Sequence, residues 1–225
     1  MRTLQANEIE CRVGYSTAKG ASLLLYKDAR VDMRMLDEIY GPTNWERYHE
    51  VVNGNLFCTV RVWDSEKGCW VSKQDVGTES NTEKEKGEAS DSFKRACFNW
   101  GIGRELYTAP FIWVTLTDAD MTNGKITTKF SCREIGYNEN REINHLVIED
   151  GKGNARYTYG KVKDESGKVK AADKQEVTLE EAIAEMYDTE SYEEVVACWK
   201  KYPQFSKEES FKKACTEQGV KHPRQ

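Results

Sequence analysis

An amphipathic helix within residues 80–107 is the clearest element that the hydrophobic pattern predicts. Apolar residues recur there at i, i+4, i+7, i+8 and i+11, a spacing that places one apolar stripe along a helix. These residues are Ala89, Phe93, Ala96, Cys97 and Trp100. Upstream, Ser80 with Glu83 and Thr82 with Glu85 have the spacing of an N-terminal cap. The glycine-rich stretch after Trp100 predicts the end of the helix.

The polar side of this helix combines cations with a large aromatic residue. Lys86, Lys94 and Arg95 lie there. Phe98 follows Lys94 by four positions and Arg95 by three, so these three are neighbours on the helix surface. Two interpretations of Phe98 remain open: it stacks on a base of a nucleic acid, or it packs against an adjacent subunit.

Three antiparallel strands are predicted ahead of this helix. Apolar and polar residues alternate at 45–52, 56–63 and 69–76, and Asn53-Gly54 between the first two runs is the strongest two-residue hairpin signal. Because side chains along a strand point alternately to opposite faces, Cys58 and Val60 define a buried face. The other face is expected to carry the cations Arg61 and Lys73 together with aromatic residues that need a cover of protein, a neighbouring subunit or bases.

A shorter helix is predicted before the strands. Asp28 can cap its start, and Gly41-Pro42 is a strong stop. Arg30 lies in the first turn, where a cation opposes the helix dipole, so we expect Arg30 to point at a partner. A role in surface solubility alone remains open for it. Residues 1–27 predict only an irregular arm that feeds a short buried segment.

The whole chain is predicted to be α+β, with three regions. Residues 1–160 form the main domain, in which further short strands follow residue 110. Residues 161–176 are polar and lysine-rich, which is typical of a linker. Residues 177–225 contain apolar residues at helical spacing and predict a small helical module, tethered to the rest.

Composition limits the functional classes. The 225 residues carry a formal net charge of −5, so a site for a polyanion has to be a local basic patch. Seven cysteines without a Cys-x-x-Cys pair predict reduced thiols rather than disulfides or a zinc site.

No apolar run approaches the ~20 residues of a membrane helix. We therefore expect a cytoplasmic protein without a membrane partner.

The order of helix, three strands and Lys-Arg helix resembles the Rad-fifty-two superfamily of single-strand annealing proteins, in its phage Sak-type and bacterial DdrA-like branch. The resemblance rests on short motifs and covers residues 22–110, about half of the chain. The motifs are Tyr40-Gly41-Pro42-Thr43-Asn44-Trp45, Val60-Arg61-Val62, Asp75-Val76-Gly77, Glu83-Lys84, the Ser90-to-Ala96 segment with Lys94-Arg95, and Gly101 to Tyr107.

The resemblance implies an ATP-independent protein that is not an enzyme and needs no cofactor. Such proteins form homo-oligomeric rings or filaments, hold single-stranded DNA in an outer groove and anneal it to a complementary strand in homologous recombination or double-strand break repair. The family's groove residues correspond to Lys94, Arg95 and a cation of the preceding helix, most simply Arg30. Phe98 departs from the pattern, because the eukaryotic branch carries an arginine there.

Residues expected to contact single-stranded DNA combine phosphate-binding cations with stacking aromatics. They are Lys94, Arg95, Arg30, Arg61, Lys73, Lys86, Phe98 and Arg104, with Tyr107 and Trp63 as further stacking candidates. The acidic C-terminal module is expected to bind a protein, such as a single-strand-binding protein or another recombination factor. The resemblance also implies a phage or prophage origin, and therefore the cytoplasm of a bacterial or phage-infected cell.

Two other functional classes remain open. A metal-dependent nuclease would use carboxylates such as Asp75, Glu79, Glu83, Glu88 or Asp91, although carboxylates beside lysines on a helix are usually ion pairs or caps. An oligomeric adaptor or scaffold of a recombination complex would use the exposed aromatics for assembly alone. A nucleotide-driven motor is disfavoured because the sequence has no phosphate-binding GxxxxGK[ST] loop.

Overall fold

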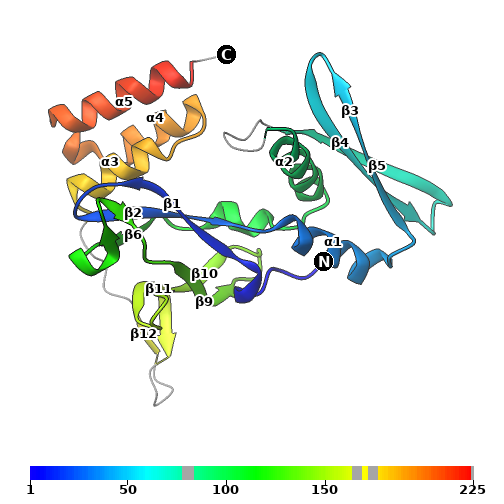
Figure 1. Cartoon of the computed structure of the whole chain (residues 1–225), viewed down its shortest axis with the longest axis horizontal. Helices are drawn as coiled ribbons and strands as arrows, with labels where there is room; N and C mark the ends of the chain where they lie inside the picture. The colour runs from blue at the N-terminus through cyan, green and yellow to red at the C-terminus, as the bar shows by residue number, and fades with distance from the viewer. Residues whose placement is uncertain (78–83, 164–168, 172–176, 224–225) are drawn as a thin grey trace. The chain divides into compact units, whose positions relative to one another are not determined.

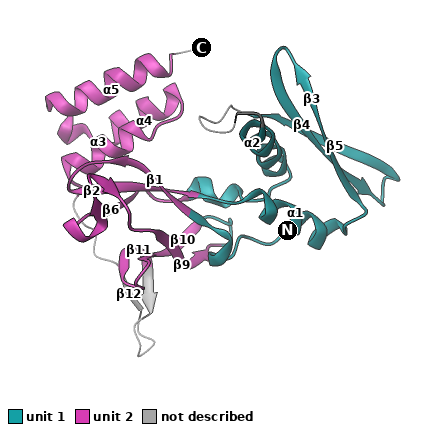
Figure 2. Ribbon diagram, viewed as in Figure 1, with its two compact units in different colours: residues 1–10, 26–108, 139–142 teal, residues 11–25, 109–138, 143–225 magenta. Residues whose placement is uncertain are grey.

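A computed structural model of the chain describes residues 1–77, 84–163, 169–171 and 177–223. The fold is α+β, with antiparallel strand pairs and α-helices (Figure 1). The chain divides into two compact units, shown in Figure 2. Unit 1 contains residues 1–10, 26–108 and 139–142, and unit 2 contains residues 11–25, 109–138 and 143–225.

Unit 1 contains the predicted order of helix, three strands and helix. Its main elements are α1 (Ala29–Tyr40), β3 (Trp45–Val52), β4 (Asn55–Asp64), β5 (Cys69–Val76), α2 (Lys84–Asn99) and the short 3-10 helix η2 (Arg104–Thr108). Asp28 caps α1 as predicted, because its side chain accepts a hydrogen bond from the Arg30 amide at 2.7 Å. The capping pairs predicted at 80–85 involve residues 80–83, which lie outside the described residues.

The core of unit 1 lies between α2 and the sheet β3-β4-β5. Cys58 and Val60 on β4 are fully buried, as are Phe93, Ala96 and Cys97 on α2. The apolar stripe predicted for this helix therefore faces the sheet. At the end of α2, Gly101 and Gly103 have φ values of +92° and +78°, the left-handed region in which glycine is preferred.

The register of the sheet corrects one prediction about its faces. Opposite residues on neighbouring antiparallel strands point to the same face, and Lys73 lies opposite Val60 whereas Arg61 lies opposite Ser72. Lys73 therefore points to the α2 side and Arg61 to the other side. The prediction that they share a face was wrong, because a shift of one residue in pairing reverses the assignment of a whole strand.

Unit 2 is built on a seven-stranded sheet. Its strands, in spatial order, are β12 (Val169–Ala171), β11 (Ala155–Lys163), β10 (Ile143–Asp150), β9 (Phe130–Tyr137), β1 (Glu10–Ser16), β2 (Gly20–Tyr26) and β6 (Ile112–Thr115). The N-terminal arm is therefore not irregular, since β1 and β2 are interior strands of this sheet. Residues 161–163 and 169–171, predicted as linker, are paired strand residues of β11 and β12.

Three helices complete unit 2, namely α3 (Leu179–Tyr187), α4 (Tyr192–Lys201) and α5 (Glu209–Lys221). The C-terminal end of α3 contacts β1: the Tyr187 and Tyr15 rings stack with centroids 4.8 Å apart, and Asp188 accepts a hydrogen bond from the Tyr15 amide at 3.2 Å. The helical module is thus docked on the sheet rather than only tethered. Among the described residues, no helix is long and apolar enough to span a membrane.

Candidate nucleic-acid interface

Arg95 extends from the side of α2 that the apolar stripe leaves exposed. Its side chain is 48% exposed, and its Nε lies 3.2 Å from Asp75 Oδ1 on β5. An exposed ion pair of this kind contributes only about 0–1 kcal/mol. An anionic ligand could therefore replace Asp75 as the partner of Arg95 at small cost.

Lys94 lies beside a buried ion pair. Lys27 donates a hydrogen bond to Asp32, and both side chains are buried. Burial raises the pKa of Asp32 to about 6, and the positive charges of Lys27 and Lys94 oppose that rise. The Lys94 ammonium group is thus close enough to α1 to act on Asp32, yet the side chain remains partly exposed.

Two of the cations expected to contact DNA, Lys73 and Arg104, donate hydrogen bonds at the C-terminus of α2. Lys73 Nζ donates to the Asn99 carbonyl at 2.7 Å. Arg104 donates from Nη2 to the same carbonyl at 2.7 Å and from Nε to the Phe98 carbonyl at 2.8 Å. The last carbonyls of a helix have no partner within the helix and carry a partial negative charge. Both cations therefore stabilise the C-terminal end of α2.

The remaining expected cations are dispersed. Arg61 lies on the sheet face away from α2 and pairs with Glu46 at 2.6 Å. Arg30 is 83% exposed at the start of α1, near Asp28. Lys86 is exposed in the first turn of α2. The structure therefore places Lys94 and Arg95 with Phe98 and Arg104 along α2 and η2, and it does not bring Arg61 to that surface.

An aromatic pair continues this surface beyond the end of α2. The rings of Phe98 and Tyr107 meet edge-to-face, with centroids 4.7 Å apart and planes 64° apart. The Arg104 guanidinium carbon lies 5.8 Å from the centroid of the Phe98 ring. Phe98 is partly buried, whereas Tyr107 is 73% exposed.

Arg47 is a cation of this region that the sequence reading missed. It is exposed, and its guanidinium carbon lies 4.2 Å from the centroid of the Phe93 ring on α2. Arg47 lies opposite Val60, so it belongs to the α2 side of the sheet. The Asn53-Gly54 turn carried the relevant signal, because it sets the pairing of β3 with β4.

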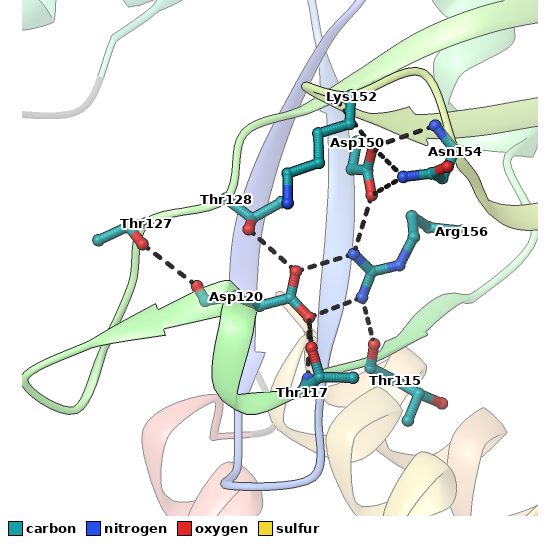
Figure 3. Close-up of polar contacts among 9 residues, drawn as sticks. All are labelled: Thr115, Thr117, Asp120, Thr127, Thr128, Asp150, Lys152, Asn154 and Arg156. Carbon is teal, nitrogen blue, oxygen red and sulfur yellow. Dashed lines mark hydrogen bonds and ion pairs between the residues drawn. The ribbon is translucent and has the colours of Figure 1, made fainter.

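A second polar cluster, in unit 2, is centred on Arg156 of β11 (Figure 3). Arg156 Nη1 and Nη2 contact the two carboxylate oxygens of Asp120 at 2.8 and 2.9 Å, and Nη2 also donates to the Thr115 carbonyl at 2.6 Å. Nη1 lies 3.3 Å from Asp150, which in turn accepts hydrogen bonds from the amides of Lys152 and Asn154. We call Asp120, Asp150 and Arg156 the Arg156 clasp.

The charged groups of the Arg156 clasp pair with one another and with neighbouring residues. Hydrogen bonds from Arg156 hold the pKa of Asp120 well below its usual range. Burial raises the pKa of Asp150, but the hydrogen bonds from Asn154, Lys152 and Arg156 together outweigh this effect and lower that pKa. The clasp residues line a cavity of about 480 Å³, together with Lys129 and Lys152. The groups of the clasp serve one another, as expected of a structural ion pair.

The carboxylates considered for a nuclease also have other partners. Asp75 binds Arg95 and Asn99, and Glu88 accepts a hydrogen bond from the Leu56 amide at 3.0 Å. Glu79 and Glu83 lie outside the described residues. Among the residues that the structure describes, no three His, Cys, Asp or Glu side chains are grouped as metal ligands.

The sequence is similar to two curated proteins that are both named single-stranded DNA-binding protein DdrA. The one from Deinococcus radiodurans is 37% identical over 101 residues, which are 44% of this chain and 47% of that protein. The one from Deinococcus deserti is 38% identical over 101 residues, 44% of this chain and 49% of that protein. The chain thus spans about half the length of these relatives. No protein-family model matches it.

Proposed function

We propose that this protein binds single-stranded DNA in DNA repair, along the exposed side of α2. The observation that carries the proposal is the adjacent pair Lys94-Arg95 on α2. The Phe98 and Tyr107 rings, which contact each other, lie at and beyond the C-terminal end of the same helix. The similarity to the DdrA proteins, named for single-stranded DNA binding, supports the same ligand. Arg47 and Arg30 are additional phosphate contacts in this proposal.

The chemistry of the surface suits binding without reading of the base sequence. Cations contact phosphates and aromatic rings stack on base faces, and both contacts leave the base edges free to pair. The protein would therefore anneal complementary strands without ATP, in homologous recombination or double-strand break repair. The resemblance to phage annealases extends this proposal to a phage or prophage setting.

The proposal includes self-association of the protein into a homo-oligomeric ring or filament. One subunit with a net charge of −5 offers few phosphate contacts, but subunits that share one strand bind it with a high effective concentration. Tyr48, Val51 and Trp63 of the three-stranded sheet are exposed large apolar side chains, which a neighbouring subunit would cover. The α3–α5 helices of unit 2 would recruit a single-strand-binding protein or another recombination factor.

The test is the double variant Lys94→Ala/Arg95→Ala, compared with Lys212→Ala/Lys213→Ala, an exposed lysine pair on α5. Binding of a labelled oligothymidylate is followed by fluorescence anisotropy over a range of salt. Each phosphate contact contributes about 0.7 to the slope of log affinity against log salt. We expect the slope of the α2 variant to fall by about 1.4, and that of the α5 control to stay unchanged.

Other outcomes decide between the alternatives. Unchanged affinity together with loss of the oligomer, seen by light scattering, would favour the adaptor. Divalent-metal-dependent cleavage of the labelled strand would favour the nuclease. Annealing of complementary strands without cleavage or ATP would exclude it.

A further inference from the structure

Tyr107 is the most exposed aromatic side chain among the described residues, at 73%. It lies in η2, directly after the helix that carries Lys94 and Arg95. An aromatic ring left in water forgoes the free energy of burial. An exposed ring that is also held in place next to cations is therefore a candidate contact for a flat, partly apolar ligand.

The surroundings of Tyr107 hold its ring in place. The Phe98 ring lies 4.7 Å away, centroid to centroid, at an angle of 64°. Phe98 is in turn flanked by the Arg104 guanidinium group, whose hydrogen bonds to the Phe98 and Asn99 carbonyls tie η2 to the end of α2. A ring supported in this way loses little rotamer freedom when it binds a ligand.

The same contacts assign different roles to the two rings. Phe98 is partly buried and already contacts both Tyr107 and Arg104, so little of its surface is left for a ligand. Tyr107 exposes most of its side chain. Phe98 therefore positions the Tyr107 ring, and Tyr107 offers the ring face on which a ligand can stack. This is a third interpretation of Phe98, beside base stacking and packing against an adjacent subunit.

We infer that Tyr107 is a stacking site for a nucleobase of the strand whose phosphates contact Lys94 and Arg95. This inference rests on the proposed function. Phe98 is one helical turn from Lys94 and Arg95, so its partner Tyr107 continues their surface. A single strand offers unpaired base faces beside its phosphates, which matches an aromatic ring beside cations. Stacking is independent of base sequence, so it leaves annealing possible.

The test separates the base from the phosphate by using two probes. One is a labelled oligothymidylate, and the other is a strand of equal length whose bases are replaced by abasic sites. The variants are Tyr107→Ala and Tyr107→Phe, with Tyr159→Ala on β11 as a control at another exposed tyrosine. Unfolding curves of each variant check that the fold is retained.

We expect Tyr107→Ala to weaken oligothymidylate binding on the order of tenfold and to leave abasic-strand binding and the salt slope unchanged. Tyr107→Phe and Tyr159→Ala should bind like the wild type. An equal loss for both strands, or no loss for oligothymidylate, would overturn the inference while the proposed function stands. If the wild type bound neither strand, or if Lys94→Ala/Arg95→Ala kept the wild-type slope, the proposed function would fail as well.

Discussion

Two arginine–aspartate contacts in this protein have similar lengths and different surroundings. Arg156 binds Asp120 at 2.8 Å with side chains only 16% and 6% exposed, whereas Arg95 binds Asp75 at 3.2 Å with side chains 48% and 23% exposed. Asp120 receives further hydrogen bonds from the amide and hydroxyl of Thr117. Burial and added partners make the first contact structural, while exposure leaves the second available to a ligand.

Removal of Arg156 should have the largest effect on stability. Arg156→Ala leaves Asp120 and Asp150 without their cation in a mostly buried site, and breaking a buried pair in this way costs roughly 3 kcal/mol of the free energy of unfolding. Urea unfolding of the variant measures this loss. A loss below about 1 kcal/mol would place the Arg156 clasp in the same class as exposed ion pairs.

The Arg156 clasp also predicts a response to acid. The folded state holds the pKa of Asp120 below its usual range, so this carboxylate contributes stability above about pH 4, which is lost as the pH falls through the lowered pKa. The wild type should lose on the order of 2 kcal/mol more than Asp120→Asn between about pH 5 and 2. If the unfolding free energies of the wild type and of Asp120→Asn changed equally with pH, the assigned role of Asp120 would be contradicted.

Lys73 tests whether one cation can both stabilise the fold and contact a phosphate. Lys73→Ala removes a hydrogen bond from the Asn99 carbonyl, where Arg104 remains, and should cost about 1 kcal/mol of unfolding free energy. If Lys73 acts only at the end of α2, the salt slope of oligothymidylate binding stays at the wild-type value. A slope lower by about 0.7 would assign it a phosphate contact as well.

Arg95 should show the smallest effect on stability and a clear effect on binding. Arg95→Ala is expected to change the unfolding free energy by less than about 1 kcal/mol, yet to lower the salt slope by about 0.7. Asp75→Asn should strengthen oligothymidylate binding, because it removes the charge that competes with phosphate for Arg95. Weaker binding by Asp75→Asn would show that Asp75 positions Arg95 for the strand.

The local sequence pattern was sufficient to predict α1, the three strands β3–β5 and α2 of unit 1. The spacing of Phe93, Ala96 and Cys97 predicted the buried side of α2, and Asn53-Gly54 predicted the β3–β4 hairpin, because both signals lie within a few residues. The weaker alternation at 10–26 did not reveal β1 and β2. Their place inside a sheet depends on partners such as β9 and β6, more than 80 residues away in sequence.

Only part of the candidate site was predicted, again because local patterns describe single elements and not the contacts between them. Lys94, Arg95 and Phe98 are neighbours on one helix, so their adjacency follows from sequence. The capping contacts of Lys73 and Arg104, and the position of Arg47 over Phe93, depend on strand register and on the path of the chain after α2. Spacing within one element contains no such information.

The sequence by itself determined which stretches of unit 1 become helix or strand and which cations share the surface of α2, because these properties repeat with the period of one element. Only the tertiary structure decided that Lys73 and Arg61 lie on opposite faces and that Asp120 meets Arg156 across 36 positions of sequence. It also decided that Tyr107 is held against Phe98 in an exposed position. Such contacts join separate elements, and their geometry is set by packing rather than by local periodicity.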